Sequence, residues 1–208
     1  MFGNILNKYA LLMGNHLESC KEDVKRLDIL LTKKGFNCES IFDCNPEKEL
    51  VSFLNRYKFT EDDLVYIHFS GHGQVFGKKI NNKMEMISTW IDQNFTDCYS
   101  YNIDKILSSL ICKFILISDS CHSGNFGNFY TGIYPSLFIS SSSIIQKSGE
   151  YKIGYVKNAG AITCFLEFIL RKINIEDLDK TFLNENLKFF YKKYKIKSNP
   201  VVKYKNIN

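Results

Sequence analysis

Phe114-Ile-Leu-Ile-Ser-Asp-Ser-Cys-His-Ser-Gly124 is the stretch of the sequence that says most about the fold. Its first four residues are apolar, as in a buried strand of a parallel sheet, and they lead into a short polar loop that contains Asp119, Cys121 and His122. In open α/β sheets, ligands bind just beyond the carboxyl ends of such strands. Cys121 is therefore a candidate reactive residue, with an inert core thiol as the alternative.

The length and composition of the chain are those of a globular protein. Its 208 residues can form one large core, and the shares of hydrophobic residues (45%) and charged residues (24%) are ordinary. We expect a single domain over residues 1–208. No apolar run is long enough to span a membrane and the N-terminus does not read as a secretory signal, so we expect a cytoplasmic protein. We also expect a monomer.

The cysteines and the charges exclude several classes of protein. Seven cysteines, without paired C-x-x-C spacing, argue against a disulfide framework and a zinc ribbon. The net charge of +5 arises in the C-terminal tail, where seven lysines and no acidic residue follow Glu185. A solvated lysine-rich helix face explains this tail more simply than a nucleic-acid or membrane surface does, so neither partner is expected.

Strand patterns and helix patterns alternate along the chain, which favours a doubly wound α/β sandwich. We expect a mostly parallel central sheet of about six strands with helices on both faces. The predicted strands are residues 9–13, 36–44, 64–69, 114–117, 136–140 and 201–202. The predicted helices begin at a Ser19/Glu22 capping box, at Asn45-Pro46, at Asn102, at Asn158 and at Ile175, and the first of them ends at Gly35.

The segment between Gln74 and Ser100 is polar and irregular, and it predicts an exposed hairpin or flap. Lys78, Lys79 and Lys83 carry the positive charges of this segment.

A second polar loop, Ser70-Gly-His-Gly73, follows the buried strand of residues 64–69. Two neighbouring strands that end in such loops can bring His72 and Cys121 to one crevice, which is the minimum needed for covalent acyl transfer. Glycines allow close approach of the backbone, so their N–H groups, with that of Cys121, could stabilise a tetrahedral oxyanion.

The two loops together resemble the signature motifs of a known family. His68-Phe-Ser-Gly-His-Gly73 and Asp119-Ser-Cys-His-Ser-Gly124, in this order and about fifty residues apart, are similar to the motifs of the caspase-like cysteine peptidases, specifically the metacaspases. The similarity extends to further segments along nearly the whole chain: residues 10–14, 19–24, 158–163 and 199–200.

The resemblance implies a catalytic dyad. Cys121 would be the nucleophile and His72 the general base and acid, with the amides of Gly73 and Cys121 forming the oxyanion hole. His68 and His122 become neighbours rather than catalysts. A zinc site on His68 and His72 is not expected, because no further ligands stand at usable spacing. His16 is most simply a loop residue.

The same motifs bear on the substrate. True caspases carry a Gln-Ala-Cys type signature, whereas Asp119 stands two positions before Cys121 and would attract a cationic side chain. By resemblance to the metacaspases, Asp23 and Asp119 line a pocket for Arg or Lys, with Ser70 beside it. We therefore expect a peptidase that cleaves polypeptides after exposed basic residues, although Asp23 could also be a solvated helix acid.

No cofactor is expected for the chemistry. Many metacaspases need calcium, but here the segment after the His-Gly motif offers only Glu85, Asp92 and Asp97, and Asn128 replaces a later acidic residue. Calcium prefers several carboxylates, so we expect weak activation at most.

Two other functions remain open. A catalytically silent caspase-like scaffold or regulatory binding module is the main alternative, against which the intact His72 and Cys121 argue. A nucleotide-binding domain would need a glycine-rich loop after the first strand, where only Gly14 is present.

Overall fold

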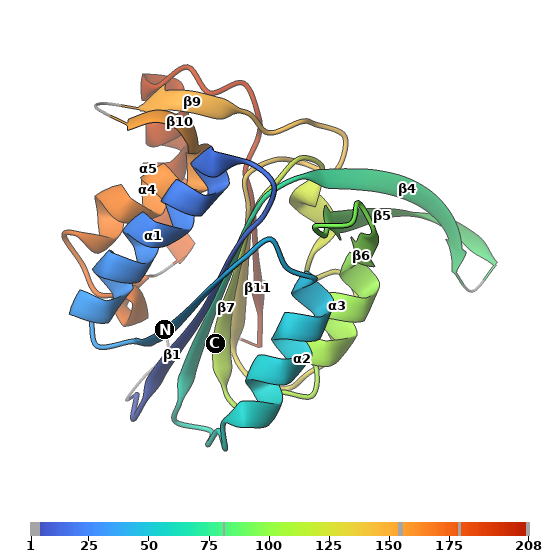
Figure 1. Ribbon diagram of the computed structural model, residues 1–208, viewed down its shortest axis with the longest axis horizontal. Helices are drawn as coiled ribbons and strands as arrows, with labels where there is room; N and C mark the ends of the chain where they lie inside the picture. The colour runs from blue at the N-terminus through green and yellow to red at the C-terminus, as the bar shows by residue number, and fades with distance from the viewer. Residues whose placement is uncertain (1–4, 81, 154–155, 179, 207–208) are drawn as a thin grey trace.

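The computed structural model describes residues 5–80, 82–153, 156–178 and 180–206. Its centre is a six-stranded sheet in the order β11-β8-β7-β3-β1-β2 (Figure 1). Every neighbouring pair is parallel except β11 and β8, so the predicted mostly parallel sheet is confirmed. The strands are β1 (Lys8–Gly14), β2 (Asn37–Phe42), β3 (Leu64–Ser70), β7 (Lys113–Asp119), β8 (Ser136–Ser140) and β11 (Val201–Lys205).

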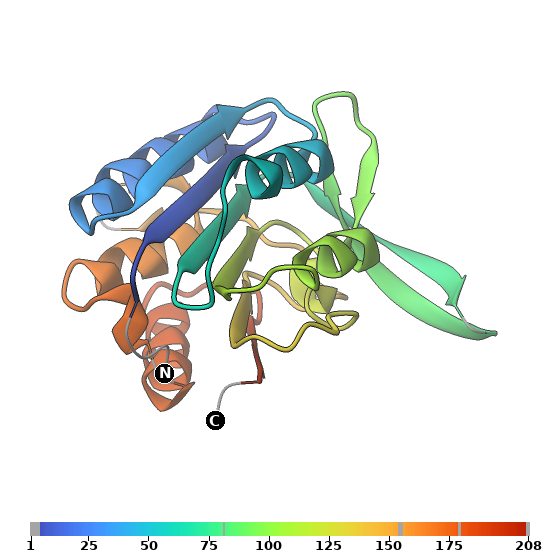
Figure 2. The ribbon, with the colours of Figure 1, turned by 90° about the horizontal axis from the view of Figure 1, so that it is seen from below.

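Helices cover both faces of this sheet, as Figures 1 and 2 show. On one face lie α1 (Glu18–Lys33), α4 (Ala161–Leu170) and α5 (Lys180–Lys193), and on the other lie α2 (Pro46–Arg56) and α3 (Ser100–Leu107). The alternation of side chains along β1 explains this division. Ala10 and Leu12 pack with α1 and α4, whereas Leu11 and Met13 pack with α2 and α3.

Two of the predicted helix boundaries are confirmed by their backbone geometry. Asn45 caps α2, because its side chain accepts a hydrogen bond from the amide of Lys48 at 3.0 Å. Gly35 has φ +83° after the end of α1, and the amide of Phe36 bonds back to the carbonyl of Leu31. This is the Schellman arrangement that favours glycine.

The predicted side-chain caps of two other helices, α1 and α3, were wrong. α1 begins at Glu18 with no side-chain cap, and the hydroxyl of Ser19 bonds to Glu150 instead of capping the helix. α3 begins at Ser100, so Asn102 lies inside the helix, and its amide bonds to Glu47. In both helices a long-range partner competes successfully with the local cap.

The segment before α4 also differs from the prediction. α4 begins at Ala161 rather than at Asn158, because residues 156–160 form β10 (Val156–Gly160), which pairs with β9 (Glu150–Ile153). The predicted helix from Ile175 is likewise divided into the 3₁₀ turn η2 (Ile175–Asp177) and α5.

The predicted hairpin after His72 is present as a long arm that projects from the molecule (Figure 2). It consists of β4 (Gly73–Ile80) and β5 (Lys83–Ile91), and β6 (Asp97–Tyr99) completes a three-stranded sheet. Its base belongs to the core, because Trp90 stacks between Phe69 and Phe126 and donates to the hydroxyl of Ser118 at 2.7 Å.

Within the described residues, no helix has the length and apolar character needed to cross a membrane.

Candidate active site

The sheet brings the two polar loops side by side. β3 and β7 are parallel neighbours in which Ser70 pairs with Asp119, so both strands end at the same edge. The amide of Gly71 donates to the carbonyl of Asp119 at 3.3 Å, which ties the two loops together. His72 and Cys121 follow within two residues on each side.

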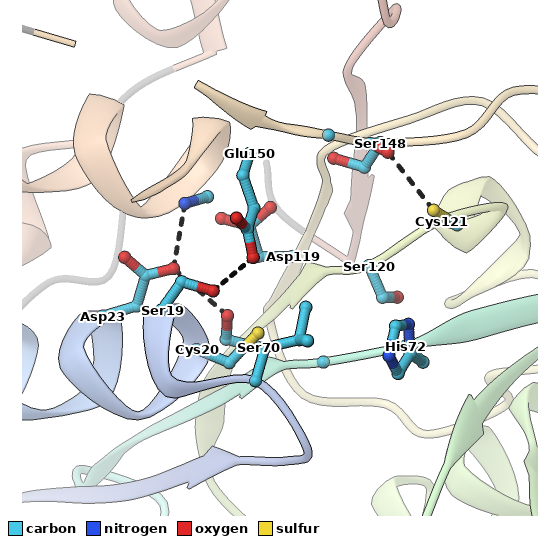
Figure 3. Close-up of a pocket in the computed structure, with 14 residues that line it drawn as sticks. Ser19, Cys20, Asp23, Ser70, His72, Asp119, Ser120, Cys121, Ser148 and Glu150 are labelled. Carbon is cyan, nitrogen blue, oxygen red and sulfur yellow. Dashed lines mark hydrogen bonds between the residues drawn. The ribbon is translucent and has the colours of Figure 1, made fainter. Parts of the chain in front are cut away.

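His72 and Cys121 line one cavity of about 210 Å³ (Figure 3). The thiol of Cys121 donates to the carbonyl of Ser148 at 3.3 Å, and no hydrogen bond joins it to His72 among the described residues. Such a contact often tightens only when substrate binds, so the free geometry leaves a dyad possible.

Burial favours the neutral form of both the Cys121 thiol and the His72 imidazole. It raises the pKa of the Cys121 thiol, with the Ser148 carbonyl and Lys147 opposing the rise. Burial lowers the pKa of His72, and the neighbouring His16 lowers it further, whereas Glu150 raises it. Both shifts favour a neutral thiol beside a neutral imidazole, so the proton would pass to His72 as the thiol attacks.

Gly73 lies so close to the cysteine loop that no side chain fits. A Cβ atom there would stand 2.3 Å from the carbonyl oxygen of Cys121 and 3.0 Å from that of Thr89. The amide of Ile91 donates to the carbonyl of His72. In an antiparallel pair of strands, hydrogen-bonded residues alternate with residues whose amides point away from the partner strand, so the Gly73 amide points away from β5. The amide of Cys121 has no partner among the described residues. Both amides are thus available, as the predicted oxyanion hole requires.

Asp23, Asp119 and Ser70 line the same cavity from α1, β7 and β3. Asp23 is only 1% exposed, which rules out a solvated helix acid. Its carboxylate accepts hydrogen bonds from the amide of Gly160 at 2.9 Å and from the hydroxyl of Ser70 at 3.2 Å. Burial raises its pKa to about 7, and Asp119 adds to the rise.

Asp119 is fixed by α4. Its carboxylate accepts from the amide of Thr163 at 2.9 Å and from the hydroxyl of the same residue at 2.8 Å. Burial nevertheless raises its pKa. The Thr163 hydroxyl also contacts Nε2 of His68 at 3.2 Å, and the His68 ring is fully buried, so this histidine packs behind the site.

Several lining residues were not predicted, among them Ser19, Cys20 and Glu150. Glu150 lies on β9 and brings a third carboxylate to the cavity, where it accepts a hydrogen bond from Ser19 (Figure 3). The sequence offered no signal for it, because the β9–β10 hairpin was not recognised and Ser19 was interpreted as a helix cap.

Arg26 partly balances the acidic groups. Its guanidinium donates to the carboxylate of Asp23 and, at 3.0 Å, to that of Glu167 on α4. Because Arg26 lies behind Asp23 and does not line the cavity, the cavity itself remains acidic.

His16, which the sequence analysis interpreted as a simple loop residue, lies beside His72. Its ring contacts those of Phe95 and His72, with centroid distances of 5.0 and 5.4 Å. Its Nε2 is 3.2 Å from the carbonyl oxygen of Ile91, the residue whose amide holds the His72 carbonyl. His16 and His72 are therefore linked through both rings and backbone.

The loop after Cys121 is anchored by the partly buried Lys203 and the buried Asp104. The ammonium of Lys203 on β11 donates to the carbonyls of Gly124 and Phe126 at 2.6 and 2.9 Å. Asp104 on α3 accepts from the amides of Gly127 and Phe129 at 2.9 and 3.0 Å. Burial lowers the pKa of Lys203 to about 8 and raises that of Asp104 to about 6.

Two acidic residues of the 74–100 segment, Asp92 and Asp97, are engaged in hydrogen bonds within the protein. The carboxylate of Asp92 already accepts from the amides of Asn94 and Thr96 at 2.8 Å, and Asp97 accepts from the hydroxyl of Thr89. Among the described residues, no group of three or more His, Cys, Asp or Glu side chains could hold a metal ion. His68 and His72 belong to no such group.

The family follows from comparison with known proteins. The family model described as the caspase domain matches residues 5–202, so the chain belongs to the caspase-domain family of peptidases. The crystal structure of protein GSU0716 from Geobacter sulfurreducens has a similar fold, with a TM-score of 0.69, 14% sequence identity, and coverage of 96% of this chain and 93% of that one. A search of the curated proteins finds no match.

Proposed function

We propose that this protein is a metacaspase-like cysteine endopeptidase that cleaves polypeptides after Arg or Lys. One observation carries the proposal: a single cavity is lined by His72 and Cys121 at one end and by three carboxylates at the other (Figure 3). The membership of the chain in a peptidase family supports the same chemistry.

In the proposed acylation, the sulfur of Cys121 attacks the carbonyl carbon of the scissile bond and its proton passes to His72. The amides of Gly73 and Cys121 donate to the oxygen on which negative charge develops. When this intermediate collapses, the C–N bond breaks and His72 gives its proton to the departing amine. A thioester remains on Cys121.

Deacylation reverses these roles. A water molecule attacks the thioester while His72 takes one of its protons, the C–S bond breaks, and the sulfur leaves as a thiolate that His72 protonates. The products are the carboxylic acid of the first fragment and the regenerated thiol. No cofactor enters this sequence.

The preference for a cationic side chain follows from the lining of the cavity. A guanidinium or ammonium group that enters it would meet Asp23, Asp119 and Glu150, with the hydroxyl of Ser70 beside them. Asp23 and Asp119 are both buried, with raised pKa values. Since a cation favours their ionised form, substrate binding and ionisation support each other.

Fluorogenic peptides with Arg, Lys or Asp before the scissile bond test this proposal, with Cys121→Ala as the inactive control. We expect release from the Arg and Lys peptides and none from the Asp peptide. Release only from the Asp peptide would overturn the specificity. Added calcium and added chelator should change the rates little, because among the described residues no cluster of three or more His, Cys, Asp or Glu side chains could hold a metal ion.

The alternative function, a silent scaffold, predicts a different result. Such a protein would bind the Arg peptide without cleaving it, and Cys121→Ala would leave that binding unchanged. Alkylation separates the cases further: an active dyad should be modified by iodoacetamide at Cys121 faster than at the six other cysteines, most of which are buried.

A further inference from the structure

A second cavity adjoins the first at the dyad. It is lined by His72, Gly73, Gln74, Val75, Cys121, His122 and Lys147. The two cavities share His72 and Cys121 and no other lining residue. A peptide whose scissile carbonyl lies at the sulfur of Cys121 therefore has one of its two sides directed to each cavity.

The proposed function, on which this inference rests, assigns the acidic cavity to the residue before the scissile bond. The second cavity then receives the leaving-group side of the substrate. β4 forms one wall of it and is the outer strand of its three-stranded sheet. Because His72 and Ile91 form a hydrogen-bonded pair, alternation turns the amide and carbonyl of Val75 away from β5. An extended peptide could bond to this free edge.

The charges of the two cavities are opposite. The first is lined by Asp23, Asp119 and Glu150, whereas no acidic residue is found among the lining residues of the second. Lys147 supplies a full positive charge there, is exposed, and forms no salt bridge with the described residues. The next residue, Ser148, is tied to the nucleophile, because its carbonyl accepts a hydrogen bond from the thiol of Cys121.

We propose that the second cavity is a subsite for the leaving-group side of the substrate and that Lys147 selects an acidic side chain just after the scissile bond. The preferred substrate is then bipolar, with Arg or Lys before the bond and Asp or Glu after it. An exposed ion pair contributes modestly, so the preference should be about two- to fivefold in kcat/KM and should weaken with added salt.

Internally quenched peptides that differ only in the residue after the Arg, taken as Glu, Gln or Lys, test this subsite. We expect kcat/KM to fall in that order for the wild-type protein and the order to reverse in Lys147→Glu. Lys152→Glu is the matched control, because Lys152 is exposed on β9 and lines neither cavity. This variant should keep the wild-type order.

The readout is the ratio of kcat/KM between two peptides, which separates selection of the substrate from the rate of the chemical steps. Lys147 also lowers the pKa of Cys121. Loss of this effect should slow the cleavage of every peptide equally, so it leaves the ratio of kcat/KM between peptides unchanged. Equal kcat/KM for the Glu and Lys peptides, or the wild-type order of peptides in Lys147→Glu, would overturn the proposed subsite and leave the proposed function standing. Failure to cleave any Arg or Lys peptide would instead overturn the proposed function.

Discussion

The ring of His16 lies against the ring of His72, with centroids 5.4 Å apart and planes inclined by 35°. The ring of His16 also stacks on that of Phe95, with planes inclined by 18°, and its Nε2 contacts the carbonyl of Ile91. His72 is thus braced on one side by a second imidazole. Such support holds a general base in one orientation, so His16 is a positioning residue in the proposed dyad.

Replacing His16 should move the pH profile of the enzyme. Its positive charge, when protonated, lowers the pKa of His72, so in His16→Phe the pKa of His72 should rise. Because His72 must be neutral to accept the proton of the thiol, the acidic limb of kcat/KM should shift to higher pH. His16→Ala should show the same shift and a larger fall in kcat, since it also loses the ring contact.

The expected measurement is kcat/KM for an Arg peptide between pH 5 and pH 8. Phe95→Ala serves as the control, because it removes ring packing from His16 without removing a charge. An unchanged acidic limb in His16→Phe would show that His16 has only a structural role.

Gly73→Ala should abolish most of the activity. The new methyl group would meet the carbonyl oxygen of Cys121 at 2.3 Å, so the cysteine loop must move away from His72 and from its oxyanion donors. Loss of one such donor typically costs about 10²–10³ in rate, and we expect at least this loss here. Gly77→Ala on the same strand is the control, because its methyl group would meet only the flexible end of Met84 at 3.0 Å. Comparable losses in both variants would contradict the argument.

The sheet was predictable from the sequence because its signals are local. Buried strands such as residues 64–69 and 114–117 read as continuous apolar runs, and the loops that follow them carry the motif residues. The order of the strands then brings those loops together. His72, Cys121 and their glycine could therefore be found without coordinates.

The rest of the site depends on contacts between distant segments. Glu150 enters the cavity from a hairpin with weak strand character, and Ser19 bonds to it over 131 positions of the chain. His16 reaches His72 because β1 and β3 are neighbours in the sheet. A periodicity within one segment carries no information on such pairs, which is why the same serine was taken for a helix cap.

Binding of the basic side chain should depend on pH through Asp23. Its pKa of about 7 means that the carboxyl becomes neutral as the pH falls below 7, so it then attracts a cation less. We expect KM for an Arg peptide to rise between pH 8 and pH 6, by at most about tenfold for each unit below the pKa. In Asp23→Asn, KM should be high and nearly independent of pH over this range.

Glu22→Gln is the control for Asp23, because Glu22 lies on the same helix but is half-exposed and pairs with Lys25. Stability gives a second readout. A carboxyl whose pKa is raised by folding stabilises the protein below its unfolded pKa near 4 and loses that contribution as the pH rises through 7. The melting temperature of the wild type, relative to that of Asp23→Asn, should therefore fall between pH 5 and pH 8. A constant difference would contradict the raised pKa.

Lys203→Met should loosen the loop that follows Cys121 while leaving the sheet intact. The substitution keeps most of the apolar stem but removes the donors to the carbonyls of Gly124 and Phe126, which are left without that partner. It also removes one of the two lysines whose charge lowers the pKa of Asp104, and leaves the other, Lys205, in place. We expect a fall in kcat of about tenfold or more with little change in KM, because the acidic cavity lies on the other side of Cys121.

Hydrogen exchange should be faster at residues 123–129, and Lys205→Met, on the same strand, should show neither effect. A lower melting temperature with unchanged kcat and unchanged exchange in the loop would mean that Lys203 supports the fold without positioning the nucleophile.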